Sequence, residues 1–186
     1  MAGELVGRKV AILLAEGVED LEYHVTRMRL EEEGAEVLTV ATTLDAVEGK
    51  NGLAAEPDTL VEDVRPGELL GLVIPGGWAP DKLRRSEAVL DLVRSVDRAG
   101  KPVGIICHGG SVAISAGIVP AGARATGSLG IKDDLVNAGA RWVDEPAFRE
   151  EHLVWGRVVA DIPAFCRELV AALVEASARE LAPSGA

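Results

Sequence analysis

The chain has 186 residues and a formal net charge of −11 at neutral pH. A chain of this length can bury a sizeable core, so we expect a single domain over residues 1–186, with an ordered core from about residue 5 to about residue 180. Its acidic surface repels nucleic acid and anionic lipid, which argues against tight binding to either. The apolar run near the N-terminus is too short for a signal peptide or a membrane span, which favours a cytoplasmic protein.

Cysteines and histidines are few and scattered. The two cysteines, Cys107 and Cys166, do not suggest a disulfide framework. The three histidines are His24, His108 and His152, and no cysteine or histidine pair has the spacing of metal ligands. We therefore predict no structural metal and no cofactor.

Apolar runs that suit buried strands alternate along the chain with helical patterns. The predicted strands lie at residues 8–15, 35–42, 69–77, 101–110, 141–146 and 151–158. The predicted helices lie at residues 19–34, 80–100, 111–117 and 161–176. Between residues 43 and 66 the pattern weakens, and Asn51-Gly52 is typical of a hairpin, so we expect short strands there at one edge of the sheet.

Apolar strands that alternate with amphipathic helices indicate a parallel sheet covered on both faces. We therefore predict a doubly wound α/β domain. In such a sheet the reactive groups gather beyond the carboxyl ends of the strands. Glu19, Gly76-Gly77 and Cys107-His108 all follow predicted strand ends.

The segment GIICHGG, residues 104–110, places Cys107 where a strand turns into a helix. The N–H groups of the following helix would point toward this side chain and favour its thiolate, so we expect a lowered thiol pKa. The alternative is an inert core cysteine, since cysteine is often buried. The neighbouring His108, the glycines after it and the second glycine-rich strand end at Gly76-Gly77 favour a reactive thiol.

Two further groups would complete such a site. The backbone N–H groups of Gly77 and His108 are candidate donors to an oxyanion, although an ordinary strand-to-loop turn is the alternative for Gly77. The acidic residues of segment 16–22 open the first predicted helix, where carboxylates complement the helix dipole. A carboxyl group beside Cys107 would have to keep its proton near neutral pH in order to stabilise the thiolate.

Four segments together resemble the ThiJ/PfpI superfamily, nearest its PfpI-type intracellular proteases and general stress proteins. They are AEGVEDLE (15–22), IPGGWAPDKLR (74–84), KPVGIICHGG (101–110) and GIKDDLVNAGARWVD (130–144). The likeness runs from about residue 8 to about residue 174. It implies a flavodoxin-like three-layer sandwich, of the class I glutamine amidotransferase type, with a nucleophile elbow.

The resemblance also implies roles for particular residues. By position in the motifs, Cys107 corresponds to the nucleophile, His108 to its neighbouring histidine and Glu19 to the acidic partner of the thiol. In PfpI-type proteins a glutamate from across an oligomer interface completes the histidine, and Asp81 stands at that position here. The resemblance therefore implies a homodimer or homohexamer, with a triad of Cys107, His108 and Asp81.

This chain departs from the family pattern at two places. The family usually has proline where this chain has Gly110, and its close PfpI-type relatives have Tyr-Pro where this chain has Ser128-Leu129. A phenol that would contact substrate is therefore missing. We expect Trp78 to reshape the same pocket, next to Gly76 and Gly77.

The function that the resemblance implies is a cysteine-dependent, stress-protective hydrolase acting on a peptide or a small molecule. Its reaction would be peptide hydrolysis, deglycation of glyoxal-derived adducts or cofactor-free glyoxalase chemistry. Each needs a thiolate that attacks an electrophilic carbon and a neighbouring group that moves protons. The alternative is a redox-sensing stress protein in which Cys107 is oxidised and substrate turnover is slight.

Overall fold

A seven-stranded sheet forms the centre of the molecule in the structure, a computed structural model that describes residues 3–181. Its strands are β1 (Lys9–Leu13), β2 (Glu36–Ala41), β5 (Thr59–Leu60), β6 (Leu69–Ile74), β7 (Val103–Ile106), β10 (Ala147–Glu150) and β11 (Leu153–Gly156). The order across the sheet is β10-β11-β7-β6-β1-β2-β5. All neighbouring strands are parallel except β10 and β11.

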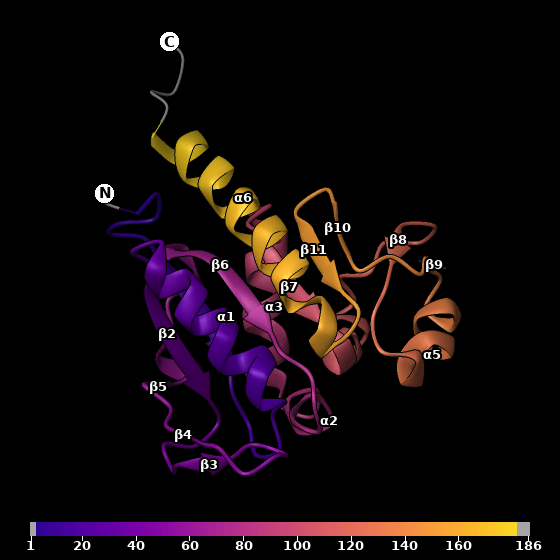
Figure 1. The fold of residues 1–186 in the computed structure, drawn as a ribbon, viewed down its shortest axis with the longest axis horizontal. Coiled ribbons are helices and arrows are strands. Elements are labelled where there is room, and N and C mark those ends of the chain that lie inside the picture. The colour runs from indigo at the N-terminus through magenta and orange to yellow at the C-terminus, as the bar shows by residue number, and fades with distance from the viewer. Residues whose placement is uncertain (1–2, 182–186) are drawn as a thin grey trace.

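Helices cover both faces of this sheet (Figure 1). They are α1 (Asp20–Glu32), α2 (Ala79–Leu83), α3 (Glu87–Arg98), α4 (Gly110–Ala116), α5 (Lys132–Asn137) and α6 (Ile162–Leu181). Helices α1 and α6 pack side by side on one face, whereas α3 and α4 pack together on the other. The predicted three-layer, doubly wound sandwich is confirmed. That one domain spans residues 1–186 stays a prediction, because residues 1–2 and 182–186 lie outside the described part.

The chain order brings the carboxyl ends of β1, β6 and β7 to one edge of the sheet. Strand β6 lies between β1 and β7, and the chain winds from β1 toward β2 on one side and toward β7 and β11 on the other. A reversal of this kind leaves a crevice at the strand ends, because the connections leave the sheet in opposite directions. The turns after these three strands carry the residues of the candidate site.

A phenylalanine fills the space over two glycines where α6 crosses the sheet. Gly104 of β7 and Gly156 of β11 lie in neighbouring strands, and a Cβ built on either would come within 3.0 Å of the Phe165 side chain. Phe165 itself is fully buried. The missing Cβ atoms thus allow the ring to approach the backbone of both strands, which anchors α6 to the half of the sheet that carries the site.

The weakly patterned region 43–66 forms a hairpin, as Asn51-Gly52 predicts. Strands β3 (Val47–Glu48) and β4 (Ala54–Ala55) pair antiparallel on either side of this turn. They form a small sheet of their own, so β5 is the one strand of this region that joins an edge of the main sheet.

Two predicted elements are wrong in detail. The segment 80–100 forms two helices rather than one, because the chain turns after α2 and the Ser86 side chain caps α3 by accepting the Val89 N–H at 3.4 Å. The strand predicted at 141–146 is only β9 (Arg141–Trp142), which pairs with β8 (Arg124–Ala125) outside the main sheet.

The sequence analysis missed β10 and α5. Strand β10 is the outermost strand and lacks the continuous apolar run of the inner strands, since only Phe148 of its four residues is buried. It reaches β11 through a tight turn at Glu151, which adopts a positive φ of 56° without being glycine. None of the helices within residues 3–181 combines the length and the apolar character needed to cross a bilayer.

The contact of Phe165 with the two glycine-containing strands gives a first prediction. Phe165→Ala should lower the free energy of unfolding by about 3–5 kcal/mol, because a large buried ring is lost and its cavity has rigid strand backbone as its floor. Phe165→Leu should cost markedly less. Denaturant unfolding followed by circular dichroism measures both, and a loss below about 1 kcal/mol for the alanine variant would contradict this role.

Candidate active site

Cys107 lies on a sharp turn between β7 and α4. Its φ is 59°, in the left-handed region that a non-glycine residue seldom adopts, and a short 3-10 turn over Cys107–Gly109 leads into the helix. Backbone strain of this kind costs on the order of 1–3 kcal/mol and persists only where the surroundings impose it. The turn lifts the thiol above the end of the sheet, as the predicted nucleophile elbow requires.

The carboxyl group that lies against this thiol belongs to Glu22. Glu22 is fully buried in the first turn of α1, and its Oε2 accepts the N–H of Gly76 at 2.8 Å. A Cβ built on Gly76 would lie 2.7 Å from both Glu22 Oε2 and Cys107 Cβ. The side chains of Glu22 and Cys107 therefore occupy the space that a methyl group on residue 76 would need. Any side chain at this position would push the acid and the cysteine away.

The predicted place of Glu19 beside the thiol is thereby corrected. Glu19 is the N-cap of α1: one carboxylate oxygen accepts the N–H of Glu22 at 2.9 Å and the other accepts from Asn51 Nδ2 at 3.1 Å. Both oxygens are thus occupied by the start of the helix and by the hairpin. The position three residues later lies inside the helix and faces the sheet, which brings Glu22 to Cys107.

Burial controls the ionisation of both groups. Loss of water around Glu22 raises the pKa of its carboxyl group to about 7. Burial also raises the pKa of the Cys107 thiol to about 12, and the negative charge of Glu22 and its hydrogen bond to the thiol add to this effect. The N–H groups of His108 and Gly77 oppose the rise without cancelling it. The expectation that the helix N-terminus lowers the pKa of the Cys107 thiol is therefore wrong for the form in which Glu22 is ionised, where this pKa is raised.

Above about pH 7, where the pair has lost its first proton, the two groups share one negative charge. Either Glu22 is a carboxylate and Cys107 a thiol, or Glu22 keeps the proton and Cys107 is a thiolate. The two forms differ only in the position of one proton, so the site titrates as a pair. N–H donors serve both forms, because Gly76 donates to the carboxylate and the amides of His108 and Gly77 lower the pKa of the thiol.

His108 is placed to exchange a proton with this pair. Its Nδ1 lies 3.3 Å from Cys107 Sγ. Burial lowers the pKa of the imidazole, and the positive charge of Lys50 lowers it further. His108 is therefore neutral at pH 7 and able to accept a proton, as general-base chemistry requires.

These residues open into a cavity of about 320 Å³. Its walls include the predicted residues Glu19, Gly77, Trp78, Cys107 and His108, together with Lys50, Ser128 and residues 158–160. Gly76 lies beneath, in contact with the thiol. Within the described residues no cluster of histidine, cysteine and carboxylate side chains is arranged to hold a metal ion.

Asp81 is not part of this cavity in a single chain. It lies on α2, its side chain is 74% exposed, and its carboxylate pairs with Arg85 at 2.6 Å. The structure therefore brings Cys107 and His108 together but leaves Asp81 on the outer surface.

Sequence reasoning missed three contributors to the site. The sequence could have predicted the place of Glu22, because it lies about one helical turn after Glu19 and so falls on the buried face of α1. Lys50 and the apolar wall at residues 158–160 could not be predicted, because they come from segments far apart in the chain.

Sequence comparison shows which known proteins this chain resembles. The profile of the DJ-1/PfpI family matches residues 8–172. A deglycase from Pyrococcus abyssi is 41% identical over 162 residues, which are 87% of this chain and 97% of the relative. General stress protein 18 of Bacillus subtilis is 36% identical over 171 residues, 90% of this chain and 99% of the relative.

Structure comparison agrees with this result. A two-domain protein from Anabaena variabilis, with DJ-1/ThiJ/PfpI-like and ferritin-like domains, superimposes with a TM-score of 0.87 and 33% identity. The match covers 89% of this chain and 48% of the Anabaena chain, so this chain spans about half of that protein.

The shared charge of Glu22 and Cys107 gives a prediction for pH dependence. The rate of Cys107 alkylation by iodoacetamide should rise with pH through a midpoint of about 7, because the pair loses its first proton there. Glu22→Gln removes the shared charge and leaves a buried thiol alone, so the midpoint should move to alkaline pH. Mass spectrometry of the peptide that contains Cys107 follows the reaction.

Glu19→Gln is the matched control for this measurement. The charge of Glu19 adds to the burial that raises the pKa of Glu22, so its removal should move the midpoint slightly toward acid, opposite to Glu22→Gln. A wild-type midpoint at the value of a free thiol, or a larger alkaline shift in Glu19→Gln, would contradict the pairing of Glu22 with Cys107.

Proposed function

This chain belongs to the DJ-1/PfpI family, and we propose that it is a stress-protective hydrolase in which the Cys107 thiolate attacks aldehyde-derived adducts, as a deglycase does. The names of its relatives support the type of reaction, since they include deglycases and a general stress protein. The close packing of Glu22 and Cys107 across Gly76 is the observation that carries the proposal. A buried acid beside a thiol at an open cavity serves no purpose in core packing.

The reactive form of the pair is the one with the proton on Glu22. In that form the carboxyl group donates a hydrogen bond to the sulfur and carries no charge, which removes the repulsion that holds the proton on Cys107. The thiolate adds to the electrophilic carbon of the substrate, a C–S bond forms, and the electron pair of the C=O bond passes to oxygen.

The backbone at the two strand ends supports the charge that develops on that oxygen. The N–H groups of Gly77 and His108 stabilise negative charge at the Cys107 sulfur, so they are candidate donors to an oxygen that becomes negative close to it. Donors fixed in the backbone need no reorganisation during the reaction, which is the reason that they stabilise an oxyanion well. Neutral His108 is placed to relay a proton from water to this oxygen, which ends the addition step as a neutral hemithioacetal.

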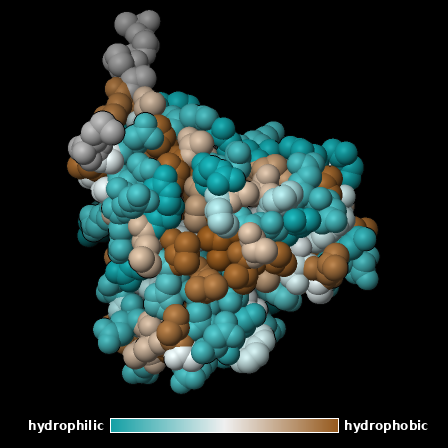
Figure 2. Space-filling model, in the orientation of Figure 1, coloured by the Kyte–Doolittle hydropathy of each residue, from teal (hydrophilic) through white to brown (hydrophobic). Residues whose placement is uncertain are grey.

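Self-association would complete this site. His108 has its Nδ1 turned to Cys107, and Asp81 is exposed on α2, so the partner subunit's Asp81 would be able to reach the histidine from outside. The outer side of α1 supports association as well. Leu21, Val25 and Met28 are exposed there, and Figure 2 shows apolar surface where the lower ends of α1 and α6 meet. We therefore propose a homo-oligomer, a dimer or a hexamer, as the active form.

Replacement of the nucleophile tests the proposed reaction. Cys107→Ala should lower kcat/KM for methylglyoxal-derived hemithioacetals by at least about a thousandfold, because the covalent step is lost. Cys166→Ala is the matched control, since Cys166 is the other cysteine of the chain and is buried between α6 and α1, away from the cavity. Full activity in Cys107→Ala would refute the assignment.

The same preparations distinguish the redox alternative. Peroxide oxidation of Cys107, followed by mass spectrometry, should leave an inactive enzyme if the thiolate performs catalysis. A protein that oxidises readily at Cys107 and turns over neither a hemithioacetal nor a peptide would favour a sensor over a hydrolase.

The proposed interface gives a further prediction. Asp81→Ala should lower kcat/KM at least about tenfold, because His108 would lose the acid that orients it in the oligomer. Asp91→Ala removes a comparable exposed carboxylate that pairs with Arg94 on α3, so it serves as the control. Size-exclusion chromatography with light scattering reports the oligomeric state, and a fully active Asp81→Ala enzyme would rule out the interface triad.

A further inference from the structure

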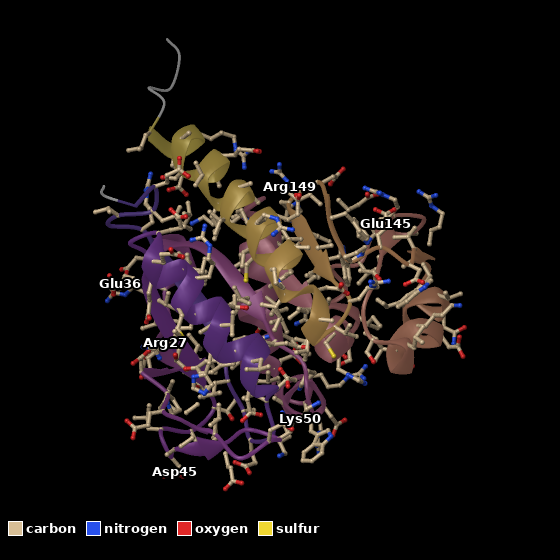
Figure 3. The ribbon with its side chains drawn as sticks, viewed as in Figure 1. Arg27, Glu36, Asp45, Lys50, Glu145 and Arg149 are labelled. Atoms are coloured by element: carbon tan, nitrogen blue, oxygen red, sulfur yellow. The ribbon has the colours of Figure 1, made fainter. Side chains whose placement is uncertain are left out.

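The active-site cavity contains a lysine that the mechanism above does not use. Lys50 lies in the turn between β3 and β4 and lines the cavity together with Trp78 and His108. Figure 3 shows it near the lower end of α1, on the side of α2. Its positive charge acts on the site, since it adds to burial in lowering the pKa of His108.

The turn that carries Lys50 is fixed in place by hydrogen bonds to the start of α1. Buried Asp20 accepts the N–H groups of Asn51 and Leu53, each at 2.8 Å, and the N–H of Lys50 donates to the Val18 carbonyl at 2.9 Å. Burial opposes ionisation of Asp20, yet these N–H groups hold its pKa below the ordinary value. The backbone of Lys50 therefore has a defined position at the mouth of the cavity.

The charge of Lys50 has no carboxylate partner among the described residues. Their lysine ion pairs involve Lys9 and Lys101 instead. The carboxylate of the cavity wall, that of Glu19, has both oxygens engaged by Glu22 and Asn51. In a chain with a net charge of −11, a cation left unpaired beside a nucleophile is available to an anionic ligand.

We propose that Lys50 binds a carboxylate of the substrate, so that the site prefers electrophiles with a carboxylate close to the carbon that Cys107 attacks. This inference rests on the proposed function and narrows its substrate class. The charges of the cavity favour a monoanion. Lys50 supplies one positive charge, whereas Glu19 and the pair of Glu22 and Cys107 supply negative charge to the same cavity, which would repel a dianion such as a phosphate monoester more strongly than a monoanion.

Two alkylating reagents of nearly the same shape test this preference without any turnover. Iodoacetate carries a carboxylate next to the carbon that reacts with Cys107, whereas iodoacetamide is neutral. The ratio of their rate constants at Cys107 cancels any change in the nucleophilicity of the thiol, since both reagents meet the same sulfur. Mass spectrometry of the Cys107 peptide gives both rates.

The variants separate a local effect of Lys50 from the overall charge of the protein. Lys50→Met should lower the ratio of iodoacetate to iodoacetamide reactivity by about three- to fivefold, as expected for a partly exposed ion pair. Lys50→Arg should keep the ratio within about twofold of wild type. Lys9→Met makes the same change in net charge at the far end of β1, so it should leave the ratio as it is.

The outcomes distinguish this inference from the proposed function. The role of Lys50 would be overturned if the ratio were the same in wild type and Lys50→Met, or if it fell as much in Lys9→Met as in Lys50→Met. In either case, labelling by iodoacetamide would still support a reactive Cys107. Failure of both reagents to modify Cys107 would overturn the reactive thiol and the carboxylate preference together. The proposal is supported if both reagents label wild-type Cys107 and the ratio of iodoacetate to iodoacetamide reactivity falls in Lys50→Met but is kept in Lys50→Arg.

Discussion

Glu22 and Cys107 are two ionisable side chains buried against each other, and the ends of three strands and one helix must meet for them to touch. Glu22 is fully buried and Cys107 nearly so, so the two groups cannot both be negatively charged without a large cost. Gly76 lets the groups approach, and its N–H satisfies the carboxylate. In the proposed reaction, the form of the nucleophile then depends on whether Glu22 or Cys107 holds the one proton. That choice is open to control by anything that adds or removes charge nearby.

The sheet supplies the rigidity that this arrangement needs. The parallel strands β6 and β7 fix Gly76 and Cys107 relative to each other, while β1 delivers α1 with Glu22 in its first turn. A strained φ at Cys107 persists because buried strands hold both sides of the turn. The stabilisation of the core by packing, such as that of Phe165 over two strands, therefore offsets the strain and the buried charge at the strand ends.

Sequence predicted the layers of this fold well, because continuous apolar strands and glycine-rich strand ends are local signals. It also predicted that Cys107, His108 and Gly77 gather at one edge of the sheet, and all three line one cavity, because each comes within three residues of a strand end. It assigned the acidic partner of Cys107 to Glu19 instead of Glu22. The capping role of Glu19 and the inward direction of Glu22 depend on the residue at which the helix begins, and the sequence alone does not define that residue. It did not predict β10, because this edge strand is mostly partly exposed and has no continuous apolar run. It did not predict the place of Lys50, because the residues around it in space are far away in the sequence.

The positive charge of Lys50, on the hairpin of β3 and β4, affects the ionisation of the groups around Cys107. Lys50 lowers the pKa of His108 in addition to the effect of burial, and it also opposes the rise in the pKa of Glu22 that burial causes. A ligand carboxylate bound to Lys50 would neutralise this charge, so both pKa values would rise when such a ligand is present. The pair of Glu22 and Cys107 would then lose its first proton at a higher pH, because less positive charge is left nearby to offset the negative charge that the pair gains. Binding of an anion at the mouth of the cavity would in this way shift the pH dependence of the pair beneath it.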